Sequence, residues 1–105
     1  MITALFKVSG EGSYKGFSVS GHSGYSEAGS DIVCAAVSSA VMLTVNICID
    51  DFNVDARTEV FDDTVRFTLI EKSESADRLI GALKEHLEAL SEGYPENVAV
   101  TIEKS

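Results

Sequence analysis

Hydrophobic and polar residues alternate in five short stretches of this chain, and each stretch predicts a β-strand. The turn-forming segment 9–13 (SGEGS) joins the first two strands into a hairpin, and the segment 61–63 (FDD) joins the next two. The predicted strands cover residues 2–8, 14–21, 53–60, 64–71 and 97–103.

Two further segments have the spacing of helices. The second, 73–93, is amphipathic, with a possible cap at Ser73 or Ser75 and an end signal at Gly93 and Pro95. Its apolar stripe consists of Ala76, Leu79, Ile80, Leu83, Leu87 and Leu90.

The first helical segment, from about Asp31 to Ile49, is apolar on most sides and predicts a buried helix. Polar residues inside it and aspartates at its ends argue against a membrane span. The interior polar residues are Ser38, Ser39, Thr44 and Asn46.

The resulting order of elements is ββαββαβ. Strands and helices in this order predict an α+β fold, a two-layer sandwich with both helices on one face of a five-stranded sheet. The chain has 105 residues and contains no linker-like or low-complexity stretch, so residues 1–105 are expected to form a single domain.

The overall charge limits the possible partners. The formal net charge is −9 and the isoelectric point is about 4.5, which argues against direct nucleic-acid binding. An acidic surface favours a basic partner, although it also serves solubility. Residues 1–8 lack the apolar core of a secretory signal, so we expect a cytoplasmic protein.

Two cysteines occur in the chain, Cys34 and Cys48. On one helix they would lie about 21 Å apart, whereas a disulfide requires Cα atoms within about 7 Å. Both are therefore expected to be free thiols. Cys48 and His86 lack the paired spacing of metal ligands, so we expect no metal and no cofactor. Cys48 is interpreted as a core residue and His86 as a surface or half-buried one.

The segment GHSGYSEAGSDIVCAAVSSA carries the candidate chemistry. His22 follows a strand, and Cys34 lies near the expected helix start, where unpaired amides favour a negative charge. A Cys–His pair is an activated nucleophile with its base. Asp31 could cap the helix, as Ser30 could, or orient His22, and Ser38 lies one turn beyond Cys34. The alternative is that Cys34 is a small buried hydrophobe.

The same segment resembles the signature of the ribosomal-processing cysteine protease family Prp, in a pattern of Gly-His, a short loop, Asp-Ile-Val-Cys-Ala-Ala and a nearby Ser. The resemblance implies that Cys34 is the nucleophile and His22 the general base and then acid. Asp31, Ser38 and Gly21 would support the site. The matching residues are Gly21, His22, Asp31, Ile32, Val33, Cys34, Ala35, Ala36 and Ser38.

Members of this family remove an N-terminal extension from bacterial large-subunit ribosomal protein number twenty-seven, after a Phe-containing segment, and are cytoplasmic homodimers. The resemblance therefore implies the same substrate and assembly for this chain. We also expect the loop 23–30 to close over bound peptide and bring His22 to Cys34.

Two other functions remain as alternatives. A non-catalytic ribosome-assembly or peptide-binding dimeric module could hold the same extension without cutting it. A thiol-based redox protein is the weaker alternative, because the chain has no C-x-x-C pair and no resolving cysteine near Cys34.

Overall fold

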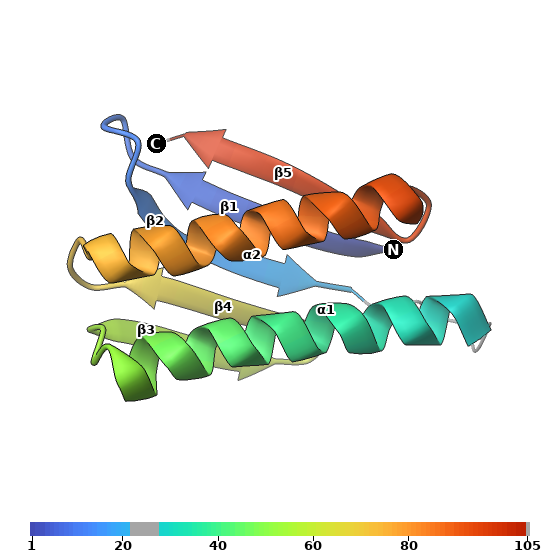
Figure 1. Ribbon diagram of the computed structural model, residues 1–105, viewed down its shortest axis with the longest axis horizontal. Coiled ribbons are helices and arrows are strands. Elements are labelled where there is room, and N and C mark those ends of the chain that lie inside the picture. Colours follow the sequence, from blue (N-terminus) through green and yellow to red (C-terminus); the bar gives the residue numbers. More distant parts are fainter. Residues whose placement is uncertain (22–27, 105) are drawn as a thin grey trace.

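The computed structural model describes residues 1–21 and 28–104, with backbone only at 28–31, and confirms the predicted order of elements (Figure 1). A short π-helical segment, η1, continues the first helix. The two-layer α+β fold predicted from the sequence is confirmed. The elements are β1 (Ile2–Val8), β2 (Tyr14–Ser20), α1 (Ala28–Asn46), η1 (Ile47–Asp51), β3 (Ala56–Phe61), β4 (Thr64–Leu69), α2 (Glu74–Gly93) and β5 (Val98–Lys104).

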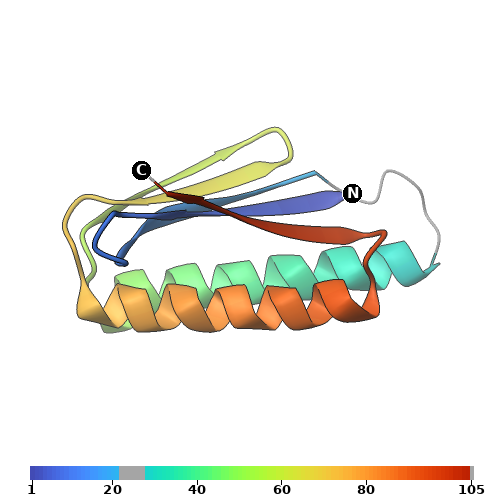
Figure 2. The ribbon, with the colours of Figure 1, turned by 90° about the horizontal axis from the view of Figure 1, so that it is seen from above.

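The five strands form one sheet in the order β3-β4-β2-β1-β5. Only the β1–β5 pair is parallel; the other pairs are antiparallel. The register places Phe6 opposite Phe17 and Phe17 opposite Phe67, so three aromatic rings form a row across the central strands. Both helices lie on one face of the sheet (Figures 1 and 2).

Helix α2 follows its sequence pattern closely. The Ser73 side chain accepts a hydrogen bond from the Ala76 backbone N–H at 3.1 Å, so Ser73 is the N-cap. The Tyr94 N–H donates to the Leu90 carbonyl at 2.8 Å and ends the helix directly after Gly93. The predicted stripe faces the core: four of its members are buried and Leu79 and Leu90 are partly buried. The four are Ala76, Ile80, Leu83 and Leu87.

The predicted start of α1 at Asp31 is wrong by three residues, because the helix begins at Ala28. Gly29 and Ser30 are weak helix formers, and their composition indicated a loop. Both are nevertheless inside α1. Cys34 is consequently the seventh residue of the helix, counting from 28, and not a residue of its first turn.

The prediction that this helix is buried is correct for one face only. Val33, Val37 and Val41 are buried, whereas Met42 is 63% and Leu43 61% exposed. By length and composition, Ile32–Asp51 would also be apolar enough to cross a membrane, but its valine face packs into the core of the domain. The spacing of apolar residues could not predict that only one face of α1 is buried, because α1 has apolar residues on both faces.

Strand β3 also starts later than predicted, at Ala56 instead of residue 53. Asn53 has a φ of 50°, in the left-handed region, so an extended strand cannot begin there. Val54 is buried, and its N–H donates to the Cys48 carbonyl at 2.9 Å. Residues 53–55 therefore connect η1 to the strand.

The one-sided burial of the helices can be tested with matched substitutions. Leu87→Ala should lower the free energy of unfolding by about 2–5 kcal/mol, because Leu87 is 0% exposed and its removal leaves a cavity. Glu85→Ala, at an exposed position of the same helix, should cost less than about 1 kcal/mol. Urea denaturation followed by circular dichroism measures both. Equal losses would contradict this description of the core.

Candidate functional site

Cys34 lies on the face of α1 that is directed toward the sheet. Val37, Ser38 and Val41 follow it at spacings of three, four and seven residues, which places them on the same helical face. The Cys34 side chain is partly buried against the core, and its thiol is free. The thiol is thus held by a rigid element without being fully enclosed.

Cys48 has a different environment and a different role. It is 0% exposed, and burial raises the pKa of its thiol. A buried, protonated thiol is a poor nucleophile. The predictions that Cys48 is a core residue and that both thiols are free are confirmed.

The helix start at Ala28 changes how Cys34 can be activated. The unpaired amides of a helix belong to its first four residues, here 28–31, and the dipole effect falls off within the first turn. The expectation that Cys34 lies in or just past the first turn is therefore wrong. Most of the unpaired amides at the start of α1 therefore lie more than one helical turn away from Cys34.

Gly21 fixes the direction in which the chain leaves β2. Its φ is 90°, and its N–H donates to the Asp63 carbonyl at 3.2 Å. A Cβ at this position would collide with the Met1 carbonyl oxygen. Only glycine combines this φ with such a close approach of backbone. Gly21 therefore anchors the backbone at the end of β2, and its supporting role in the site stays a prediction.

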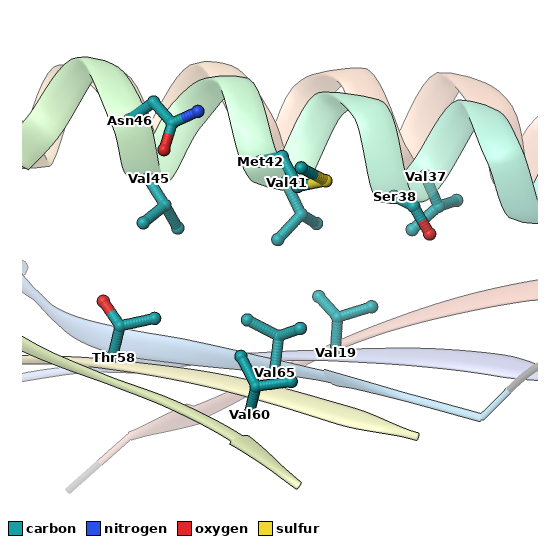
Figure 3. A pocket seen from close by; sticks show the side chains of 10 residues that line it. All are labelled: Val19, Val37, Ser38, Val41, Met42, Val45, Asn46, Thr58, Val60 and Val65. Atoms are coloured by element: carbon teal, nitrogen blue, oxygen red, sulfur yellow. The ribbon is translucent and has the colours of Figure 1, made fainter. Parts of the chain in front are cut away.

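A cavity of about 250 Å³ lies between α1 and the sheet, and Ser38 contributes to its lining (Figure 3). Ser38 is exposed and lies one turn beyond Cys34, as the sequence predicted. The strand residues that line the cavity could not be predicted from the sequence, because they are distant from Cys34 in the chain and no motif connects them to it. The other lining residues are Val19, Val37, Val41, Met42, Val45, Asn46, Thr58, Val60 and Val65.

Several predicted features lie outside the described residues. They include His22, the Asp31 side chain and residues 23–27 of the predicted loop, so the Cys34–His22 pair, the orienting role of Asp31 and the loop closure stay predictions. Residues 28–30 of the predicted loop belong to α1 instead. His86 is exposed on α2, which confirms its interpretation as a surface residue. Within residues 1–21 and 28–104, no three His, Cys, Asp or Glu side chains are grouped to hold a metal ion.

Comparisons with known proteins add independent information. Residues 1–99 match the family described as "Cysteine protease Prp". A solved structure of the ribosomal processing protease Prp from S. aureus, in complex with a covalently linked product peptide, is similar in fold, with a TM-score of 0.89 at 24% identity over 98% of this chain and 100% of that one.

Two further structures agree with this similarity. The S. aureus protease with a substrate peptide has a TM-score of 0.85 at 23% identity, covering 98% of this chain and 100% of that one. SMU.848 from Streptococcus mutans has a TM-score of 0.82 at 29% identity, covering 100% of this chain and 96% of that one. No curated protein matches the sequence.

The contrast between the two thiols predicts different reactivity. In the native protein, iodoacetamide should label Cys34 at least about ten times faster than Cys48, because Cys48 is buried and its pKa is raised. In urea the two rates should converge. Peptide mass spectrometry over a time course measures both sites. Native labelling of Cys48 at the rate of Cys34 would contradict the assignment.

The role of Gly21 can be separated from simple backbone strain with a second glycine. Gly12 has the same φ of 90° but nothing near its Cβ position. Gly12→Ala should therefore cost about 1–2 kcal/mol of strain alone. Gly21→Ala should cost at least about 1 kcal/mol more, since the Met1 carbonyl must also move. Equal losses in urea denaturation would contradict the close approach.

Proposed function

The chain belongs to the cysteine protease Prp family, and we propose from this membership that it is an endopeptidase that removes the N-terminal extension of bacterial large-subunit ribosomal protein number twenty-seven. The cut follows a Phe-containing segment of that extension. The observation that carries the proposal is the family match over residues 1–99, which includes the whole Gly-His to Cys-Ala-Ala signature.

In the proposed reaction, Cys34 is the nucleophile and His22 the general base. His22 takes the thiol proton while the sulfur attacks the carbonyl carbon of the cut bond, and then gives this proton to the leaving amine. A water molecule then attacks the resulting thioester while its proton passes to His22. The carbon–sulfur bond breaks, the carboxylic acid product leaves, and His22 returns the proton to the Cys34 thiolate. Because Cys34 is beyond the first turn of α1, the activation of its thiol depends on His22.

The architecture supports bringing these two residues together. Val19, two residues before Gly21 on β2, lines the same cavity as Val37, three residues after Cys34 on α1. The end of β2 and the first half of α1 therefore face each other across a short space. Gly21 then directs the chain out of the sheet at this point. In the proposal, Asp31 orients His22, and Ser38 donates a hydrogen bond within the site.

A peptide substrate is supported by the solved relatives. The S. aureus structures contain a substrate peptide in one case and a covalently linked product peptide in the other. The formal net charge of −9 on this chain favours a basic protein such as a ribosomal one. Electrostatic attraction of this kind accelerates encounter more than it strengthens the final complex.

We further propose that the enzyme acts in the cytoplasm as a homodimer, without a cofactor and without direct contact to nucleic acid or membrane. Ile32 is 65% and Leu43 is 61% exposed on an α1 that carries no charged residue between 32 and 49. Such an uncharged helix surface is typical of a protein contact.

The proposed reaction predicts which substitutions stop it. Cys34→Ala and His22→Ala should each lower cleavage of the extended ribosomal protein by at least about a thousandfold, because either change removes one half of the nucleophile–base unit. Cys48→Ala is the matched control and should cut normally. Mass spectrometry of the new N-terminus measures the reaction.

Two results would argue against this assignment. Full activity of Cys34→Ala would exclude Cys34 as the nucleophile. Tight binding of the extension by the unaltered protein with no cleavage would instead favour the non-catalytic binding module.

A further inference from the structure

Two large apolar side chains are exposed on opposite walls of the cavity between α1 and the sheet. Met42 on α1 is 63% exposed and Val60 on β3 is 72% exposed (Figure 3). Five of the other eight lining residues are valines, and the remaining three are the uncharged polar residues Ser38, Asn46 and Thr58. An exposed apolar surface of this kind in so acidic a chain indicates a contact with another molecule.

The cavity begins about one helical turn beyond Cys34, at Val37 and Ser38. Residues 34, 38, 41 and 45 follow one another at spacings of three and four, so they form one row along α1. The last three of them line the cavity. A chain lying along this row therefore has one end at the Cys34 thiol and continues over Ser38 toward Asn46.

Strand β3 provides the opposite wall and a free edge. It is the terminal strand of the sheet order within the described part of the chain. The Ile70 N–H donates to the Asp55 carbonyl at 2.9 Å, which identifies a hydrogen-bonded pair just before β3. Since such pairs alternate in an antiparallel ladder, the backbone groups of Thr58 and Val60 point away from β4. An extended peptide can pair with them while its side chains enter the cavity.

Charge is distributed to match a peptide that is apolar in one part and basic in its flanks. The walls of the cavity carry no charged side chain. Asp62 and Asp63 lie at the turn that follows β3, and Asp50, Asp51 and Asp55 lie where η1 leads into it. Both ends of β3 are thus flanked by aspartates, whereas the cavity wall that β3 contributes carries no charge.

We propose that this cavity and the β3 edge bind the extended segment of the peptide substrate next to the cut bond. One apolar side chain of the peptide enters between Met42 and Val60, which are specificity-determining residues. The peptide backbone pairs with Thr58 and Val60. The inference rests on the proposed protease function, and it assigns the part of the molecule that reads the substrate.

Near-isosteric substitutions test the two walls. Val60→Thr and Met42→Gln should each lower kcat/KM for a peptide of the extension by about tenfold, mainly through KM, because each places a polar group against the bound apolar side chain. The control is Ile102→Thr on β5, which is 50% exposed at the opposite edge of the sheet and should leave kcat/KM unchanged.

The peptide is varied in parallel. Replacing the apolar residue nearest the cut bond by Ser should lower cleavage by the unaltered enzyme, and this loss should not add to that of Val60→Thr. Methylating one peptide amide at a time should reduce cleavage at alternate positions only, as expected for strand pairing. Additive losses, or a uniform effect of methylation, would overturn the assignment.

Failure of this proposal is distinguishable from failure of the proposed function. If the unaltered protein cuts and both wall variants cut within about twofold of it, the groove assignment is wrong and the protease function stands. If nothing cuts, fluorescence anisotropy with the same peptide decides: unchanged binding by Val60→Thr overturns the groove, and weakened binding supports it. The alternative occupant of the cavity is a second copy of this chain, and analytical ultracentrifugation tests it. A Val60→Thr variant that becomes monomeric while its kcat/KM is unchanged would show that a second copy fills the cavity and would overturn the proposal.

Discussion

The aromatic row across the central strands is the contact on which the rest of the structure depends. Phe6, Phe17 and Phe67 come from β1, β2 and β4, with ring centroids 5.8 and 5.4 Å apart along the row. Each such pair contributes about 0.5–1.5 kcal/mol beyond the burial of its area. All three rings belong to the same buried cluster as Ile80 and Leu87 of α2, so the row joins the sheet to that helix.

This arrangement leaves α1 in a different situation from α2. Helix α2 has a well-defined apolar stripe, four members of which are buried in the core. Helix α1 has apolar residues on both faces, and the β3–β4 hairpin tilts away from it at the turn (Figure 2). The cavity opens in this space. Helix α1 therefore carries both Cys34 and an exposed apolar surface that a ligand can contact. One helix can in this way supply the nucleophile and part of the binding surface.

Much of the fold could be predicted because it follows from local patterns. Spacing and residue type predict the order of elements, the stripe of α2 and two candidate caps, Ser73 and Ser75, of which the structure uses Ser73. The errors occurred where two principles competed. Gly29 and Ser30 suggested a loop but are helical, and residue 53 continued an alternating pattern although Asn53 turns the backbone into the left-handed region.

The sequence by itself determined the elements, the separation of the two thiols and the family, because periodicity, helix rise and a contiguous motif are all local properties. Only the tertiary structure decided which face of α1 is covered, that Cys34 lies beyond the first turn, and that Val60 of β3 faces Met42 across a cavity. It also brought Gly21 against the Met1 and Asp63 carbonyls. These contacts join residues far apart in the chain, and they depend on strand order and sheet twist, which no local pattern encodes.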